Sequence, residues 1–169
     1  MRPAQICGGD PLCSLGGGHG FATVLQIHRG CPVTDTRAIV RELYDAYGKG
    51  DGSRVAQFLH DDIDWVIYAP VDVFPFAGVR RGRQAVLGAL ADIGANYLLR
   101  SYQPEIMIVD GDRAAVMSDV HFVQKSSGRA LRFRLANFLR IADGRVIEFR
   151  EFIDTFDAVE QALGRELAL

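Results

Sequence analysis

The sequence predicts an α+β fold in which helices come first and a meander of antiparallel strands follows. Apolar residues recur at helical spacing in much of residues 34–95, and they alternate with polar residues in much of residues 102–153. Short glycine-containing segments, typical of hairpin turns, separate the alternating stretches; they are DGD (110–112), SSG (126–128) and ADG (142–144). The expected element order is α-α-β-α-β-β-β-β-α.

Capping residues, glycines and the apolar stripe from Ile39 to Tyr47 define the elements of the first half. The expected elements are a helix that Thr34 or Asp35 caps and Gly48 ends, a short helix that Asp51 or Ser53 caps and that His60 and Asp61 close, a strand over 63–69, a loop over 69–82 and a helix over about 82–95.

Alternation defines the second half. The expected elements are strands over 102–109, 113–124, 130–142 and 145–153, and a short helix over 155–163 that Asp154 caps. Long antiparallel strands with one apolar face should curl over the helices, so we expect a pocket between the sheet and the helices.

Residues 1–33 differ in composition from the rest of the chain. They hold all three cysteines and seven of the 18 glycines, and they show no sustained period. We therefore expect a poorly ordered glycine-rich tail over 1–33 and one domain over 34–169; a start codon assigned too far upstream would also explain the tail. A domain without cysteine fits a reducing compartment, so we expect a cytoplasmic protein.

Charge and motif content argue against several classes of partner. The 21 acidic and 19 basic residues nearly balance and form no basic block, so we expect no nucleic-acid partner. No apolar run is long enough for a membrane span. The glycine-rich segment 8–20 lacks a GK[ST] ending, and the tail cysteines and histidines match no familiar zinc spacing, so we expect neither a cofactor nor a metal.

Two polar residues interrupt the apolar faces of neighbouring strands. Glu151 does so in segment 144–154, and Asn137 does so in segment 131–141. Unpaired buried polar groups cost roughly 1–3 kcal/mol, so these side chains need each other, water or a ligand. We take both as candidate catalytic residues that line a pocket. The alternatives are a satisfied core hydrogen bond or a strand that runs out to solvent.

Asp119 and His121 share one face of their strand and form a second candidate catalytic pair, in which the histidine is a base near neutral pH and the aspartate orients it. The register of the SSG turn decides where they lie. In one register they oppose apolar residues and face the pocket; a shift of one residue places them opposite Arg132 and Arg134, as ion pairs on the outer face. The sequence leaves both registers open.

Four apolar residues are expected to line the pocket and contact a ligand; they are Trp65, Phe133, Leu135 and Phe149. For Trp65 a plain core role is the alternative.

Four segments carry a resemblance to a known family; they are YDAYGKGD (44–51), FLHDDIDW (58–65), FAGVRRGRQAV (76–86) and LANFLRIADGRVIEFREFIDTFDAVEQALG (135–164). In order and spacing, the chain resembles the NTF2-like superfamily over about 34–164. It is most similar to the SnoaL-like branch, which resembles ketosteroid isomerases, polyketide cyclases and limonene-epoxide hydrolases. The resemblance implies a cone of three N-terminal helices packed on a curved, mostly antiparallel sheet, with a short C-terminal helix. It also implies a homodimer formed through the outer face of the sheet.

The resemblance to epoxide hydrolases places Glu151 where those enzymes carry a catalytic aspartate. Asp119 falls near their second acid, but their arginine falls at Met117, which cannot polarise an epoxide oxygen.

The resemblance to ketosteroid isomerases places Asn137 near the protonated aspartate of their oxyanion hole, and an amide can also donate to an oxyanion. The positions of the isomerase base and tyrosine hold Ile67 and Leu43, so steroid isomerisation by the familiar residues is not expected.

We therefore expect a small-molecule pocket protein of the SnoaL-like type. The preferred hypothesis is an isomerase-, cyclase- or lyase-like enzyme without a cofactor, in which Glu151 is the base and Asn137 the donor for a small apolar, carbonyl-bearing substrate. The alternatives are a non-catalytic binder of a small hydrophobic molecule and an epoxide hydrolase-like enzyme.

Overall fold

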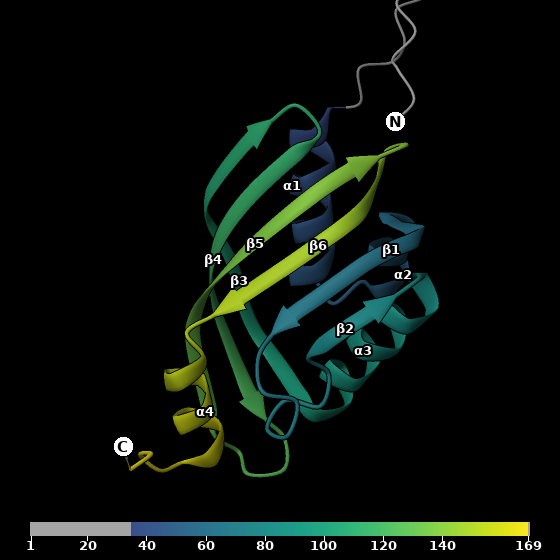
Figure 1. Ribbon diagram of the computed structural model, residues 1–169. Coiled ribbons are helices and arrows are strands. Elements are labelled where there is room, and N and C mark those ends of the chain that lie inside the picture. The colour runs from purple at the N-terminus through teal and green to yellow at the C-terminus, as the bar shows by residue number, and fades with distance from the viewer. Residues whose placement is uncertain (1–34, 169) are drawn as a thin grey trace, which may run out of the picture. The chain divides into compact units, whose positions relative to one another are not determined.

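The computed structural model describes residues 35–168, which form a six-stranded sheet and four helices. The strand order is β2-β1-β6-β5-β4-β3, and all neighbours are antiparallel except β1 and β6 (Figure 1). The predicted α+β class and the curved, mostly antiparallel sheet are confirmed. The expected tail over 1–33 lies outside the described residues.

Side-chain caps begin three of the four helices in the described part of the chain. The helices are α1 (Thr36–Gly48), α2 (Gly52–Gln57), α3 (Arg83–Asn96) and α4 (Thr155–Leu163). Of the alternative caps, Asp35 accepts a hydrogen bond from the Ala38 amide, and Asp51 accepts one from the Arg54 amide. Asp154 caps α4, as predicted. Only α1 and α2 precede the sheet, because α3 follows β2.

The strands are β1 (Leu59–Tyr68), β2 (Gly78–Arg81), β3 (Tyr97–Asp110), β4 (Arg113–Gln124), β5 (Ala130–Ala142) and β6 (Arg145–Ile153). The bounds of β4, β5 and β6 agree with the prediction.

The structure corrects three boundaries in the rest of the sheet. β1 begins at Leu59, because this residue pairs with Val146 before an irregularity in the pairing; the sequence placed Leu59 in a helix. The expected loop over 69–82 contains β2, whose residues pair with the end of β1. β3 begins at Tyr97, five residues earlier than expected, because α3 passes directly into the strand without a turn.

The core lies between the concave face of the sheet and the helices α1 and α3 (Figure 1). Irregular pairing interrupts β3 at two places, between Leu99 and Ser101 and between Pro104 and Ile106. Such bulges increase the local twist of a strand, which helps the sheet to curl. No helix in residues 35–168 is long and apolar enough to cross a membrane.

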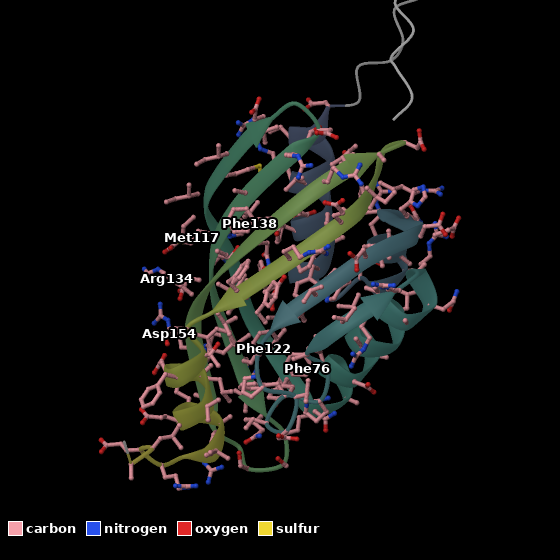
Figure 2. All side chains as sticks on the ribbon, viewed as in Figure 1. Phe76, Met117, Phe122, Arg134, Phe138 and Asp154 are labelled. Carbon is pink, nitrogen blue, oxygen red and sulfur yellow. The ribbon has the colours of Figure 1, made fainter. Side chains whose placement is uncertain are left out.

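The outer face of the sheet carries arginine–carboxylate pairs between neighbouring strands and an aromatic cluster. The cluster consists of Tyr68, Phe138 and Phe152, which are each about half exposed; Phe152 contacts the other two rings. Figure 2 shows Phe138, Met117 and Arg134 along this face.

Candidate active site

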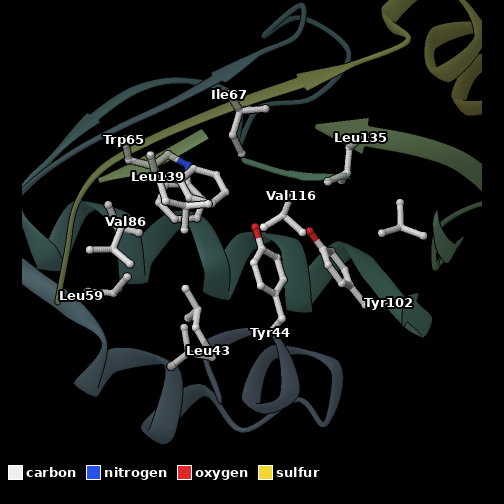
Figure 3. Packing of buried hydrophobic residues seen from close by; sticks show 14 of the residues in the cluster. Leu43, Tyr44, Leu59, Trp65, Ile67, Val86, Tyr102, Val116, Leu135 and Leu139 are labelled. Atoms are coloured by element: carbon white, nitrogen blue, oxygen red, sulfur yellow. The ribbon is translucent and has the colours of Figure 1, made fainter. Parts of the chain in front are cut away.

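A cavity of about 80 Å³ lies between the concave face of the sheet and the helices. Apolar and aromatic side chains form nearly all of its wall. Figure 3 shows some of them, such as Leu43 and Trp65, within the hydrophobic core. The four residues predicted to contact a ligand all line it; they are Trp65, Phe133, Leu135 and Phe149. Trp65 stacks on Phe149 with 3.7 Å between the ring centroids, so β1 and β6 build one wall together. Ligand contact by these residues remains a prediction.

Asn137 and Glu151 lie together on the concave side of the sheet. They are register partners on β5 and β6, and the Nδ2 atom of Asn137 donates a 2.9 Å hydrogen bond to Oε2 of Glu151. Asn137 is fully buried, whereas Glu151 borders the cavity. The two polar interruptions found in the sequence therefore meet, as expected of a common site.

Two tyrosines complete the environment of Asn137. The hydroxyls of Tyr44 on α1 and Tyr102 on β3 donate to Oδ1 of Asn137 at 2.8 Å and 3.1 Å. Figure 3 shows the two hydroxyls side by side. With both lone-pair positions of Oδ1 occupied, the amide turns Nδ2 toward Glu151. The network therefore fixes one oxygen of the carboxylate.

The carboxylate of Glu151 has no cationic neighbour in the cavity wall, where no lysine, arginine or histidine occurs among the described residues. Burial raises the pKa of Glu151 to about 7, and the hydrogen bond from Asn137 opposes this rise only in part. Its Oε1 atom accepts no hydrogen bond from any residue within 35–168. Glu151 is therefore suited to accept a proton near neutral pH.

Three tyrosines are the site residues that sequence reasoning missed. Tyr44 and Tyr47 lie one turn apart on α1 and were interpreted as part of its core-facing stripe, and Tyr102 was only the first residue of an expected strand. Burial, and secondarily the charge of Glu151, raises the pKa of the Tyr47 hydroxyl, which therefore stays protonated. A repeated tyrosine in a helix stripe, where leucine would pack equally well, was the available signal.

Asp119 and His121 do not belong to this site. In β4 they oppose Arg134 and Arg132, which is the outward of the two registers that the sequence allowed. Asp119 forms an ion pair with Arg132, whose hydrogen bond lowers the pKa of the aspartate. The buried residues that alternate with them, such as Val120, face the core instead. The expectation that Asp119 and His121 are catalytic is therefore corrected.

The epoxide hydrolase-like arrangement is also not formed around Glu151. Met117 lies on the same outer face as Asp119, because the two residues are separated by two positions along β4. Neither borders the cavity, so the second acid and the arginine of that chemistry have no counterpart from β4.

Comparison with known proteins places this geometry in a family. A model of the SnoaL-like domain matches residues 40–149. The chain belongs to the SnoaL-like domain family. None of the curated proteins matches the chain.

Solved structures agree with a SnoaL-like domain of NTF2-like fold. A candidate isomerase from Rhodopseudomonas palustris is 36% identical, with a TM-score of 0.68 over 75% of this chain and 94% of that one. An NTF2-like protein from Burkholderia xenovorans is 25% identical, with a TM-score of 0.67 over 79% of this chain and 99% of that one.

A limonene-epoxide-hydrolase-like enzyme from M. tuberculosis shares the fold at 16% identity, with a TM-score of 0.64 over 78% of this chain and 92% of that one. At this identity the likeness concerns the fold of the SnoaL-like domain and not its chemistry.

Proposed function

We propose that the cavity is the active site of a cofactor-free enzyme that moves a proton on a small, carbonyl-bearing substrate, as isomerases, cyclases and some lyases do. One observation carries this proposal. Glu151 presents a carboxylate with a pKa of about 7 to an apolar cavity, with no cation beside it. Such a group loses and regains a proton readily at neutral pH.

In the proposed reaction, Glu151 removes a proton from the carbon beside the carbonyl and returns it at another carbon. Asn137 acts as a positioning residue, because it donates a hydrogen bond to Oε2 of Glu151 and leaves Oε1 of the same carboxylate available to the substrate. This role differs from the expected donation to an oxyanion, since Asn137 is fully buried behind Glu151.

Tyr47 is the best-placed donor for the developing enolate oxygen. It lines the cavity and lies close enough to Glu151 to respond to its charge. Its hydroxyl has no hydrogen-bond partner in the described part of the chain, whereas the hydroxyls of Tyr44 and Tyr102 are already bound to Asn137. A donor aimed at a developing oxyanion can contribute roughly 3–4 kcal/mol of transition-state stabilisation.

Deuterium exchange tests this function without knowledge of the natural substrate. The protein is incubated in heavy water with a panel of small ketones and aldehydes, and incorporation beside the carbonyl is followed by NMR. Glu151→Gln should reduce the exchange rate by roughly 10²–10⁴. Glu148→Gln is the matched control, because Glu148 lies on the same strand and pairs with Arg140 outside the cavity. Equal rates in wild type and Glu151→Gln would exclude the proposed base.

A non-catalytic binder of a small hydrophobic molecule is the second candidate. The nearly continuous apolar wall favours it, because such a wall provides binding without chemistry. Saturable binding of a ketone, without any deuterium exchange that depends on the protein, would support the non-catalytic binder.

A further inference from the structure

The cavity wall combines many aromatic rings with a single charged group. Of the 20 residues that line it, ten are aromatic, nine are aliphatic and one is a carboxylate. The aromatic residues are Tyr44, Tyr47, Trp65, Phe74, Phe76, Tyr97, Tyr102, Phe122, Phe133 and Phe149. Aromatic rings carry negative electrostatic potential on their faces, so this wall and the carboxylate share one sign.

The groups around Glu151 leave its charge uncompensated. Tyr44 and Tyr47 approach it from α1, and Tyr102 approaches from β3. Its strand neighbours contribute an amide, Asn137, and an aliphatic side chain, Ile67. The tyrosines titrate far above neutral pH because burial raises their pKa values, so Glu151 is the group that changes charge near pH 7.

A buried carboxylate that lacks a counter-ion is stabilised by any cation that reaches it. The aromatic faces add to this attraction, and cation–π contacts are strongest where water is excluded. An anion of the same shape would meet repulsion from Glu151 and find no cation in the wall.

We propose that this cavity binds a small alkylammonium ion, with the cationic centre beside Glu151 and the alkyl groups against the aromatic wall, and that it excludes carboxylates of similar shape. The proposal concerns the same cavity as the proposed reaction, but it rests on the lining and not on the reaction. A bound cation occupies the base, so it is also a competitive inhibitor of proton transfer.

Cavity size limits the guest to a very small ion. Apolar cavities of about 150 Å³ accept benzene, and the volume here is about half of that. Ethylammonium is much smaller than benzene and keeps its positive charge across the pH range of the test, so it is a suitable probe.

The experiment compares three small probes of similar size that differ in charge. These are ethylammonium, the neutral ethanol and the anionic acetate, each titrated into the full chain and followed by NMR. At about pH 8.5 Glu151 is ionised, and ethylammonium should bind at least about ten-fold more tightly than ethanol, while acetate should not bind. At about pH 5.5 Glu151 is protonated, and the preference for the cation should disappear.

Glu151→Gln should lose the preference at both pH values, and Glu148→Gln should keep it. The pH comparison on the wild type needs no variant, so it tests the proposal even if a variant folds poorly. Binding of ethanol equal to or tighter than that of ethylammonium at the higher pH would overturn the proposal.

The ketone exchange measurement separates this inference from the proposed reaction. Cation binding without any ketone exchange would refute the reaction alone. Glu151-dependent exchange without cation binding would refute the present inference alone.

Discussion

Asn137 donates to Glu151 across the β5–β6 pairing and receives the hydroxyls of Tyr44 and Tyr102 on its other side. The amide thus joins α1, β3, β5 and β6 around a single fully buried side chain. Because each partner comes from a different element, the orientation of the Glu151 carboxylate depends on the packing of the whole domain.

Glu151 should make the stability of the domain depend on pH. Its pKa is higher in the folded protein, about 7, than the ordinary value of 4.5, so the folded state binds this proton more tightly than the unfolded state does. Stability from this group is therefore full below about pH 4.5 and falls as the pH rises to about 7. One pKa unit corresponds to about 1.4 kcal/mol, so the cost above pH 7 reaches up to about 3 kcal/mol.

Glu151→Gln should remove this dependence. We expect the variant to be more stable than the wild type at about pH 8 by up to about 3 kcal/mol, and to differ little at about pH 4.5. Thermal unfolding across this pH range measures the difference. A pH profile of the variant that runs parallel to the wild type would show that Glu151 is not the group that titrates.

Asn137→Leu should be among the most destabilising substitutions in the sheet. The change removes three hydrogen bonds and leaves two buried hydroxyls and one carboxylate oxygen without their partner. Each buried orphan costs roughly 1–3 kcal/mol, so denaturant unfolding should show a loss of at least about 3 kcal/mol. Asn96→Ala is the control, since the side chain of Asn96 is exposed and bonds only to a carbonyl of its own helix; it should change stability by less than about 1 kcal/mol.

Tyr44→Phe and Tyr102→Phe should be coupled. Each hydroxyl donates to the same Oδ1 atom, so one donor still satisfies Asn137 when the other is removed. Each single variant should lose roughly 0.5–1.5 kcal/mol, and the double variant should lose more than the sum. A double-mutant cycle of unfolding free energies measures the coupling. Strict additivity would show that the two hydrogen bonds stabilise the fold independently.

Asp119→Asn should leave proton transfer unchanged, because Asp119 lies on the outer face and pairs with Arg132. Ion pairs at the protein surface contribute little to stability, so the unfolding free energy should change only slightly. The ketone exchange assay and a denaturant melt check both expectations. A large loss of ketone deuterium exchange would show that Asp119 contributes to the reaction.

The aromatic cluster of Tyr68, Phe138 and Phe152 should be the contact surface of the homodimer that we propose. Exposed aromatic clusters on an otherwise charged face mark association surfaces. Phe152→Lys should weaken self-association by at least about ten-fold, as measured by sedimentation at several concentrations. Val71→Lys is the control, because Val71 is equally exposed but lies in the loop before β2. A monomeric wild type would refute the proposal.

The periodicity of apolar residues was sufficient to predict those strands that short, glycine-containing turns separate. Alternation predicted β5 and β6, and with them the shared face of Asn137 and Glu151, because each turn is short and contains glycine. It failed where α3 passes into β3 at Tyr97, since neither glycine nor proline marks that boundary. It also failed at Leu59, whose strand pairing depends on the distant residue Val146.

The candidate site was only partly predictable for a related reason. A carboxylate in an apolar strand face is visible in the sequence, but its partners come from α1 and β3, which are remote along the chain. The register of β4 determines which face of the sheet Asp119 and His121 occupy. The alternation of apolar and polar residues does not distinguish between two registers that differ by one residue.

The parallel pairing of β1 with β6 has a consequence for the order in which the molecule can assemble. β6 lies between β1 and β5 in the sheet but is the last strand to leave the ribosome. Until it arrives, no strand joins the β1–β2 hairpin to the β3–β5 meander, and only the helices, such as α3, pack against both parts. Closing this long loop is entropically costly, which should make insertion of β6 the slow step of folding. The same strand brings Glu151, so a nascent chain completes its sheet and gains the carboxylate of the cavity in one event.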